Sequence, residues 1–183
     1  MGRKRVIDPD MILDAAEEVT RERGAGQVSL DAVAKRAGIS KGGLMYHFPT
    51  KDALISAITK RDIGRFEEML ATRANEIGPV AHAVLHARID VTEAESPESS
   101  AKGASLLAAL AQTPEHLGPI RNIYVEELAR FDPATEDGRR ARVALVAIEG
   151  AFLLRGLGLV NLDDAEWAAI FDDIRALVPK GER

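Results

Sequence analysis

A helix-start signal that recurs along the chain is the feature that most constrains its fold. Asp8 is followed by Pro9, a residue suited to the first position of a helix, and the flanking residues Ile7 and Ile12 can pack across this start. The same arrangement, a capping side chain between two apolar residues, recurs at Ser29, Ser40 and Asp163, and Thr50 provides one more cap. A chain with so many helix starts is built mainly from helices.

Glycine and proline residues mark where several of these helices end. Gly24, Gly38, Pro49 and Gly78 each follow a stretch in which apolar residues have helical spacing. The predicted helices cover residues 9–23, 30–37, 41–47, 51–75, 79–93, 99–112, 116–131, 133–154 and 164–178. No stretch shows the strict alternation of a strand, so the predicted fold class is all-α.

Helix length divides the chain into two parts. Short helices fill residues 9–47 and longer helices fill the rest, which predicts a three-helix N-terminal domain over residues 1–49 and a C-terminal helical bundle over residues 50–183. The last two helices are apolar over much of their surface, which is typical of a subunit interface; alternatively, they close the core of a monomer. The predicted interface residues are Leu145, Ile148, Phe152, Trp167, Ile170, Phe171 and Ile174.

Composition excludes several classes of protein. The chain has no cysteine, which excludes disulfides and thiolate metal sites and is compatible with the cytoplasm, the location we expect. No secretion signal or membrane span is expected, because the longest apolar run, residues 143–154, is short and contains Glu149. Neither a nucleophile with a base nor a phosphate loop is present, so we expect no enzyme activity and no cofactor.

Two charged patterns need separate interpretations. The net charge of −5 argues against DNA binding by the whole surface, but the first 64 residues are net positive while the rest is acidic. His82, His86 and Asp90 have a spacing that a divalent metal could use, yet the remaining positions of their helix are apolar. A polar face exposed to water explains these three side chains better, and no metal is expected.

Residues 30–47 have the spacing of a helix-turn-helix. An apolar stripe on the first helix faces inward, Gly38 allows a left-handed turn, and Ile39 and Leu44 anchor the second helix on the same small core. The side chains that then face outward from the second helix are Lys41, Gly42, Met45 and Tyr46. A helix presenting such a face is suited to the major groove of DNA.

Two adjacent glycines in this short second helix are unusual, because a glycine in a helix interior costs about 1 kcal/mol relative to alanine. Gly42, on the outward face, would let the backbone approach the duplex closely. Gly43 has no such role in the pattern.

The segments "ILDAAEEV" and "SLDAVAKRAGISKGGLMYHFPTKDAL" resemble the DNA-binding region of the tetracycline-repressor-like (TetR) family of transcriptional regulators. The resemblance is specific over residues 8–58. Three features depart from the family pattern: Val19-Thr20 replaces an apolar-aromatic pair, "GAGQVS" replaces a loop that commonly has an aromatic residue, and Met45 stands where tyrosine is frequent. Since Met45 lies on the expected groove surface, base preference is expected to differ there.

The resemblance implies a set of DNA-binding residues. Those expected to face the groove or the phosphates are Lys41, Gly42, Met45, Tyr46 and His47, with Ser29, Ser40, Thr50 and Lys51 at helix starts and an N-terminal arm of Arg3, Lys4 and Arg5. Each has a simpler interpretation. Tyr46 and His47 could be packing residues, Lys41 a solvated lysine, and the arm a tail without function.

The resemblance also implies an effector pocket in residues 50–183, linked to the DNA-binding domain by the helix over residues 51–75. The expected pocket residues are Phe66, Met69, Leu70, Leu106, Leu110, Tyr124, Glu149 and Phe152. Glu149 is a lone acid in an apolar helix, so it should meet an arginine such as Arg155, a subunit partner or a ligand.

Together these features predict a homodimeric repressor that binds a near-palindromic operator in double-stranded DNA and is released by a small-molecule effector. Two alternatives remain. The C-terminal bundle could serve for assembly alone, without an effector. The chain could also be an all-α enzyme or carrier in which residues 30–47 are merely helical.

Overall fold

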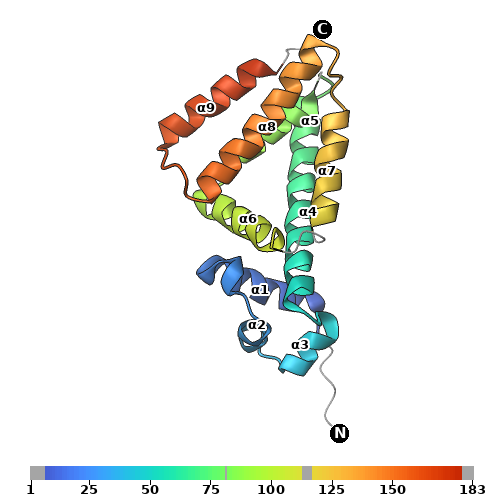
Figure 1. Ribbon diagram of the computed structural model, residues 1–183, viewed down its shortest axis with the longest axis vertical. Helices are drawn as coiled ribbons and strands as arrows, with labels where there is room; N and C mark the ends of the chain where they lie inside the picture. Colours follow the sequence, from blue (N-terminus) through green and yellow to red (C-terminus); the bar gives the residue numbers. More distant parts are fainter. Residues whose placement is uncertain (1–6, 81, 113–116, 179–183) are drawn as a thin grey trace.

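The computed structural model describes residues 7–80, 82–112 and 117–178, and the regular structure in these ranges is helical throughout (Figure 1). The elements are α1 (Pro9–Arg23), the short 3-10 helix η1 (Ala25–Gln27), α2 (Leu30–Ala37), α3 (Lys41–His47), α4 (Lys51–Ile77), α5 (Ala83–Glu93), α6 (Pro97–Leu110), α7 (Gly118–Ala129), α8 (Glu136–Gly156) and α9 (Asp164–Leu177). The all-α prediction is confirmed. Arg3, Lys4 and Arg5 lie outside the described residues.

Helices α1, α2 and α3 form a compact head at one end of the molecule (Figure 1). Their starts are capped as predicted, because the side chains of Ser29, Ser40 and Thr50 each accept a hydrogen bond from the backbone N–H three residues later. Gly38 ends α2 in the left-handed conformation, with φ 67° and ψ 31°. These local signals set the angle between α2 and α3.

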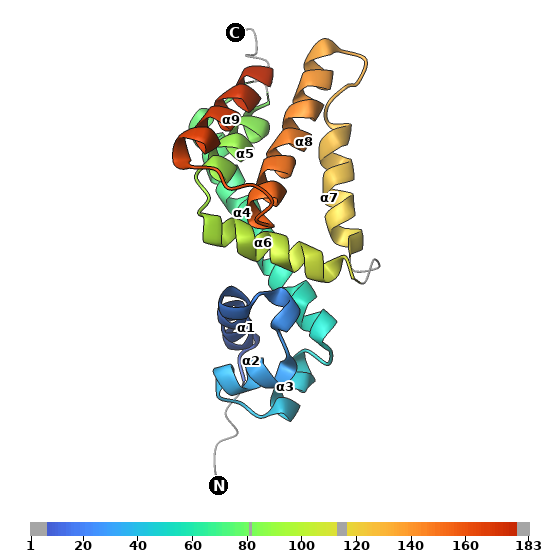
Figure 2. The ribbon, with the colours of Figure 1, turned by 60° about the vertical axis from the view of Figure 1, so that its left-hand side comes forward.

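Helix α4 begins in the head and continues into the second part of the molecule, while α6 crosses the molecule between the head and the other helices (Figure 2). The backbone N–H of Ala25 in η1 donates a hydrogen bond of 2.8 Å to the Ser105 hydroxyl of α6. The head is therefore joined to the rest of the protein at α6 as well as through α4.

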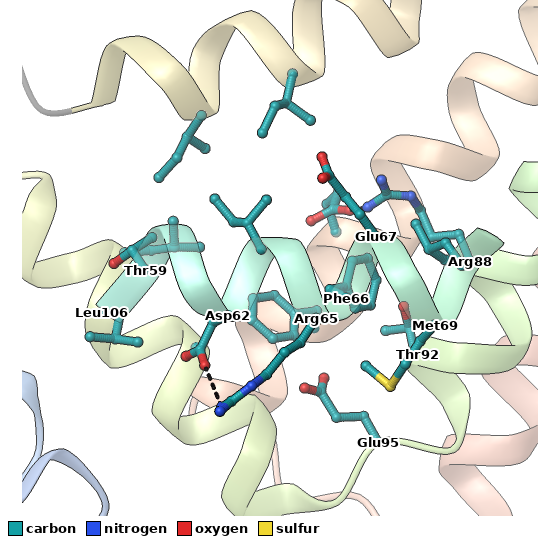
Figure 3. A pocket seen from close by; sticks show the side chains of 18 of the residues that line it. Thr59, Asp62, Arg65, Phe66, Glu67, Met69, Arg88, Thr92, Glu95 and Leu106 are labelled. Carbon is teal, nitrogen blue, oxygen red and sulfur yellow. Dashed lines mark hydrogen bonds and ion pairs between the residues drawn. The ribbon is translucent and has the colours of Figure 1, made fainter. Parts of the chain in front are cut away.

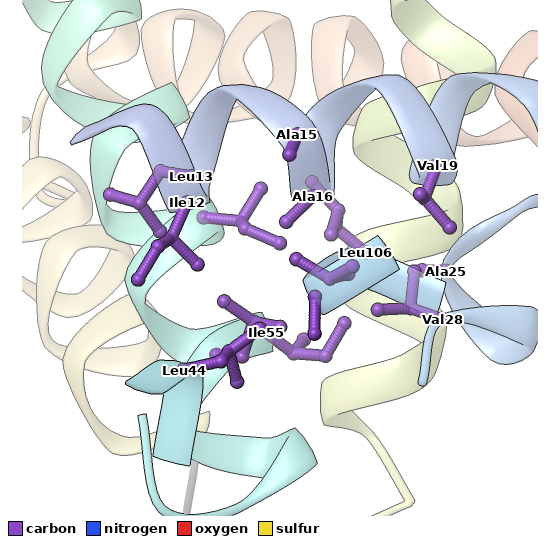
Figure 4. Close-up of a cluster of buried hydrophobic side chains, with 14 of the residues drawn as sticks. Ile12, Leu13, Ala15, Ala16, Val19, Ala25, Val28, Leu44, Ile55 and Leu106 are labelled. Carbon is purple, nitrogen blue, oxygen red and sulfur yellow. The ribbon is translucent and has the colours of Figure 1, made fainter. Parts of the chain in front are cut away.

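Two clusters of buried apolar side chains hold the molecule together. The first fills the head and takes in Leu106 and Leu110 of α6, so it extends across the predicted boundary between residues 49 and 50 (Figure 4). The second joins α5, α8 and α9 around Phe171, Ile148 and Ile89. Among the described residues, no helix combines the length and apolar character needed to cross a membrane.

Four helix starts differ from the predicted ranges. Helix α5 begins at Ala83 instead of residue 79, and helix α7 begins at Gly118 instead of residue 116. Helix α6 begins at Pro97, because Ser96 caps it by accepting a hydrogen bond from the Ser99 N–H. Helix α8 begins after Thr135, which caps it in the same way. At the starts of α6 and α8, the capping residue and a nearby proline stand among polar residues. Such a composition is typical of a loop, so the sequence does not mark these starts clearly.

The structure corrects the predicted subunit interface. Five of its residues are buried within the protomer, and a side chain with almost no exposed surface has little to offer a partner. These residues are Leu145, Ile148, Trp167, Phe171 and Ile174. Of the other two, Ile170 packs beside this core, and Phe152 lines a cavity described below. The five buried side chains belong to the core of the protomer itself.

Candidate nucleic-acid interface and internal cavity

Helix α3 turns one side inward and the other outward, as its spacing predicts. Leu44 has no exposed surface and anchors the helix in the head cluster. Lys41, Gly42, Met45 and Tyr46, which we call the reading face, are exposed. Tyr46 is 85% exposed, which is unusual for an aromatic residue without a partner surface.

The two glycines of α3 have different surroundings. A Cβ atom on Gly42 would meet nothing within 4 Å, so the reading face is open at this point. A Cβ atom on Gly43 would lie 2.7 Å from the Ile7 Cδ1 atom. Gly43 therefore serves the packing of Ile7 against the start of α3, a role that the sequence pattern does not indicate.

The predicted phosphate-contacting residues lie at three helix starts. The hydroxyls of Ser29, Ser40 and Thr50 accept bonds from the backbone, and each retains its own hydrogen as a donor. The Lys51 ammonium donates to the carbonyl of Gly26 at 2.7 Å. His47 lies edge-on to Tyr46 with 5.2 Å between ring centroids. The head thus presents donors suited to phosphate oxygens beside the reading face.

Lys41 already has a partner in the protein. Its ammonium is 2.9 Å from a carboxylate oxygen of Asp31 on α2, and both side chains are more than half exposed. An exposed ion pair of this kind contributes about 0–1 kcal/mol. Lys41 can therefore exchange Asp31 for a DNA contact at little cost.

A cavity of about 350 Å³ lies between α4, α5, α6, α7 and α8 (Figure 3). Seven of the eight predicted pocket residues line it: Phe66, Met69, Leu70, Leu106, Tyr124, Glu149 and Phe152. The eighth, Leu110, is a correction: it is buried in the head cluster, because α6 crosses onto the head before it ends. The volume is within the range of about 300–1,000 Å³ typical of small-molecule sites.

Glu149 is bound by Arg88 of α5 and not by Arg155. The Arg88 guanidinium donates to Glu149 at 2.7 Å and also to Glu127 of α7, while the Tyr124 hydroxyl donates to Glu149 at 2.6 Å. We call these four residues the Arg88 cluster. Burial, together with the neighbouring charge of Glu149, raises the pKa of Tyr124, so its hydroxyl remains a donor.

Arg155 has other partners. It donates to the backbone carbonyl of Glu95 at 3.0 Å, and its guanidinium lies 4.2 Å from the centroid of the Trp167 ring. Arg88 is the residue that the sequence prediction missed. The available signal was that Arg88 stands between the apolar residues Ala87 and Ile89, and that its charge is opposite to that of Glu149 on another helix.

A second group of charges, which we call the Glu17 cluster, joins the head to the cavity wall. Glu17 of α1 accepts hydrogen bonds from Arg61 at 2.7 Å and Arg65 at 3.0 Å, both on α4. The Lys102 ammonium of α6 is 3.4 Å from Glu17 and 2.9 Å from Asp62. Asp62, Arg65 and Lys102 also line the cavity, so its wall and the head share these side chains.

These contacts change the acidity of Glu17. Burial alone would raise the pKa of its carboxyl, but the hydrogen bonds from Arg61 and Arg65 and the charge of Lys102 outweigh burial. The pKa of Glu17 is therefore lowered from its ordinary value. The carboxylate stays ionised at neutral pH and keeps all three cations.

Two of the three residues with metal-like spacing, Asp90 and His82, have other contacts. Asp90 pairs with Arg73 of α4 at 2.8 Å and with Arg175 of α9 at 3.0 Å. His82 begins α5 in a left-handed conformation, and its ring lies 5.5 Å from that of Phe131. In the described part of the chain, no group of three such side chains is arranged to hold a metal ion.

Comparison with protein families decides whether residues 30–47 are a DNA-binding motif or merely helical. Residues 12–58 match the model for bacterial regulatory proteins of the tetR family, and residues 80–179 match the model for the tetracyclin repressor-like C-terminal domain. The chain belongs to the TetR family. It is accordingly a helix-turn-helix DNA-binding transcriptional regulator, a member of a family of regulators and not of enzymes.

Curated relatives match over part of the chain. The HTH-type transcriptional regulator UidR of Escherichia coli K12 is 43% identical over 61 residues, which cover 31% of each chain. A fatty acid metabolism regulator of Bacillus subtilis is 34% identical over 59 residues, covering 32% of this chain and 30% of that protein. These matches span only about a third of the curated relatives.

Solved structures match over the whole length. The multidrug binding protein EbrR in complex with imidazole superposes with a TM-score of 0.70 at 22% identity and covers both chains fully. Its complex with ethidium gives a TM-score of 0.68, covering 93% of this chain and 98% of that chain. At this level of identity, the likeness shows a common fold.

Proposed function

We propose that this TetR-family protein is a repressor that binds a near-palindromic operator as a homodimer and leaves it when a small molecule enters the cavity. Residues 1–49 would read the DNA, and residues 50–183 would bind the effector and dimerise. Since the proposed partner is chromosomal DNA, we expect the protein to act in the cytoplasm.

The reading face supports operator binding. One short helix contacts only a few base pairs, so specific binding needs two heads related by a two-fold axis, about one helical turn or a multiple of it apart. Lys41 and Tyr46 would contact base edges and backbone, and Met45 would contact the groove through an apolar side chain. The hydroxyls at the helix starts would set the register through phosphates.

An exposed apolar stripe supports dimerisation. Along one side of α8 and at its C-cap, apolar side chains remain exposed: Val143, Val146, Leu153 and Leu154 of the helix, and Leu157 directly after it. The outward side of α9 carries Ala165 and Ala169, which are small enough for close approach. A second copy packed on this surface would bury the stripe that the protomer leaves open. We propose this stripe as the interface in place of the buried residues.

The Glu17 cluster is the observation that carries the proposal of effector control. Asp62, Arg65 and Lys102 contact the cavity on one side and are linked to Glu17 of the head on the other. A ligand that moves these side chains alters how α1 is held on α4 and α6. The ligand releases the DNA only if it binds more tightly to the arrangement in which the spacing of the two heads does not fit the operator. A coupling free energy between ligand and DNA binding of about 1–3 kcal/mol is typical.

The alternative, a bundle that only assembles the dimer, predicts a closely packed C-terminal part. The cavity of about 350 Å³ favours the effector. Ligand binding is compatible with the fold, since EbrR shares it and has been crystallised with imidazole and with ethidium.

Selection of bound sequences from genomic fragments tests the proposed function. We expect a two-fold symmetric site, protected by a complex whose sedimentation corresponds to two chains per site. The variant Val146→Glu places a charge in the stripe and should weaken both dimerisation and operator binding. Binding of a single chain to an asymmetric site would overturn the homodimeric repressor, and unchanged assembly of Val146→Glu would overturn the stripe as its interface.

A further inference from the structure

The charged side chains on the cavity wall are not balanced. Five carboxylates line it: Asp62, Glu67, Glu95, Glu127 and Glu149. The basic residues on the wall are Arg65, Arg88 and Lys102, fewer than the acids. Since the wall carries more negative than positive groups, the interior favours a positive ligand over a negative one.

The basic residues are also already used by the protein. Arg65 and Lys102 pair with Glu17 and Asp62, and Arg88 pairs with two carboxylates at once. An anionic ligand would have to displace a buried carboxylate to reach one of these cations. Breaking such a pair leaves a buried charge without a partner, which opposes anion binding.

Glu127 supplies the specific point of attachment. Its side chain is 14% exposed, and one of its oxygens, Oε1, accepts from Arg88. The other oxygen, Oε2, is buried and has no hydrogen-bond partner among the residues that the structure describes. A buried carboxylate oxygen without a donor is unfavourable. Glu127 lines the cavity, so a small rotation of its side chain would let a ligand with a charged N–H group reach Oε2 and remove this cost.

The remaining surface suits an apolar body. Phe66, Phe152 and Tyr124 contribute aromatic rings, and Ile63, Leu70 and Ile123 contribute aliphatic side chains. Aromatic rings pack favourably against flat apolar groups and attract cations to their faces. The Phe66 ring already has the Arg88 guanidinium 5.2 Å from its centroid, so a positive group is compatible with these surroundings.

We infer that the effector is an amphipathic organic cation, a protonated amine or amidine on an aromatic or aliphatic body, whose N–H group donates to Glu127 Oε2. This inference rests on the proposed function, because it takes the cavity as the effector site. It goes further by naming the charge and the donor that the ligand must have. A quaternary ammonium ion supplies the charge but not the donor, and it should bind less well.

Calorimetric titration of the DNA-free protein with four probes that share one body tests the ligand class. The probes are biphenyl-4-methylamine, its N,N,N-trimethylammonium analogue, biphenyl-4-methanol and biphenyl-4-carboxylate. We expect the amine to bind about tenfold or more tightly than the alcohol, since a hydrogen bond to a charged group is worth about one such factor. The quaternary ion should rank between them, and the carboxylate should be weakest.

Two variants locate the contact. Glu127→Gln keeps an oxygen for Arg88 but removes the charge, so the amine should lose about tenfold in affinity while the alcohol is unchanged. Glu126→Gln makes the same charge change at an exposed position of α7 and should have no effect. The ranking of the four probes on the unaltered protein decides the ligand class even if Glu127→Gln does not fold.

The outcomes separate this inference from the proposed function. Absence of binding by the amine, or binding of the alcohol or carboxylate as tightly as the amine, overturns the cationic class. If the amine binds as expected but operator binding is unchanged at saturation, the ligand class stands and effector release fails. If Glu126→Gln and Glu127→Gln lose affinity equally, the contact with Oε2 is wrong.

Discussion

The reading face and the cavity use charged residues in opposite ways. On the reading face, Lys41 is exposed and has one weak partner, Asp31, in the neighbouring helix. In the cavity, Arg88 is 7% exposed and is held by residues of α7 and α8. Substitutions on the reading face should therefore change function without changing stability, whereas substitutions in the cavity should change both.

The largest expected effect comes from breaking the Arg88 cluster. Arg88→Leu removes the only cation between Glu127 and Glu149 in the cluster and leaves both part-buried carboxylates without a positive partner there. Loss of one partner of a buried ion pair costs about 3–5 kcal/mol. Urea denaturation at pH 7 should show a decrease of this size in the unfolding free energy.

A compensated variant provides the control for this prediction. Arg88→Leu combined with Glu127→Gln and Glu149→Gln leaves no unpaired charge, and it should recover a large part of the lost stability. If the single variant loses less than about 1 kcal/mol, a value typical of exposed ion pairs, the contrast between cavity and reading face is wrong.

The same contrast explains which parts could be predicted from the sequence. The ranges of α1, α2 and α3 match the structure, because caps, turn glycines and apolar spacing act over a few neighbouring residues. Seven pocket residues were found because they are apolar or aromatic positions on the faces that helices turn toward one another, together with the lone acid Glu149. Arg88 and its two carboxylates are distant in sequence, and no local pattern assigns one to the other.

The spacing of apolar residues along a helix also does not determine which of them are buried in the protomer and which remain exposed to solvent. Ile148 and Val146 are both apolar residues of α8, yet Ile148 is fully buried while Val146 is 61% exposed. Only the packing of α9 and α5 on one side of α8 distinguishes them. The interface prediction therefore selected the apolar side of α8 that faces the core.

A second prediction compares two glycines, one in each region. A Cβ atom on Gly156 in α8 would lie 2.4 Å from the Ser100 carbonyl oxygen and 2.7 Å from the Ala104 Cβ atom. Backbone cannot move aside easily, so Gly156→Ala should lower the unfolding free energy by about 1–3 kcal/mol. The measurement is thermal or urea denaturation.

Gly43→Ala is the matched change in the head. There the added atom meets the end of the Ile7 side chain, which can rotate away, and alanine favours the helix by up to about 1 kcal/mol. Its net effect on stability should be close to zero. Equal losses for the two variants would mean that α6 and α8 do not cross as closely as the structure indicates.

A third prediction concerns substitutions that weaken operator binding but leave the unfolding free energy unchanged. Lys41→Ala and Tyr46→Ala should each weaken operator binding by about 5- to 150-fold, the range expected for a groove contact of about 1–3 kcal/mol. Their unfolding free energies should stay within about 0.5 kcal/mol of the original, because both side chains are exposed. Binding is measured by fluorescence anisotropy at several salt concentrations.

Arg121→Ala serves as the control, since it removes one positive charge from an exposed position of α7. Its operator affinity and salt dependence should remain unchanged. If Lys41→Ala behaves like Arg121→Ala, then Lys41 is a solvated lysine and the reading face is misassigned.

The smallest effect is expected at Glu17, where the two regions meet. Because the pKa of Glu17 is lowered in the folded protein, its ionised form contributes stability at pH values above the ordinary carboxyl pKa of about 4.3. That contribution is lost as the pH falls from there through the lowered folded-state pKa. Glu17→Gln should therefore be less stable than the original protein at pH 7, by about 1 kcal/mol, and the difference should shrink as the pH approaches 3.

The functional consequence of Glu17→Gln distinguishes a coupling role from a purely structural one. The neutral amide would hold Arg61, Arg65 and Lys102 less firmly than the carboxylate does, so the head should be less tightly bound to α4 and α6. We expect operator affinity without effector to change little, while the factor by which a saturating effector weakens it becomes smaller. An unchanged factor would show that cavity and head communicate by another route, such as α4 alone, and would leave the Glu17 cluster with only its contribution to stability.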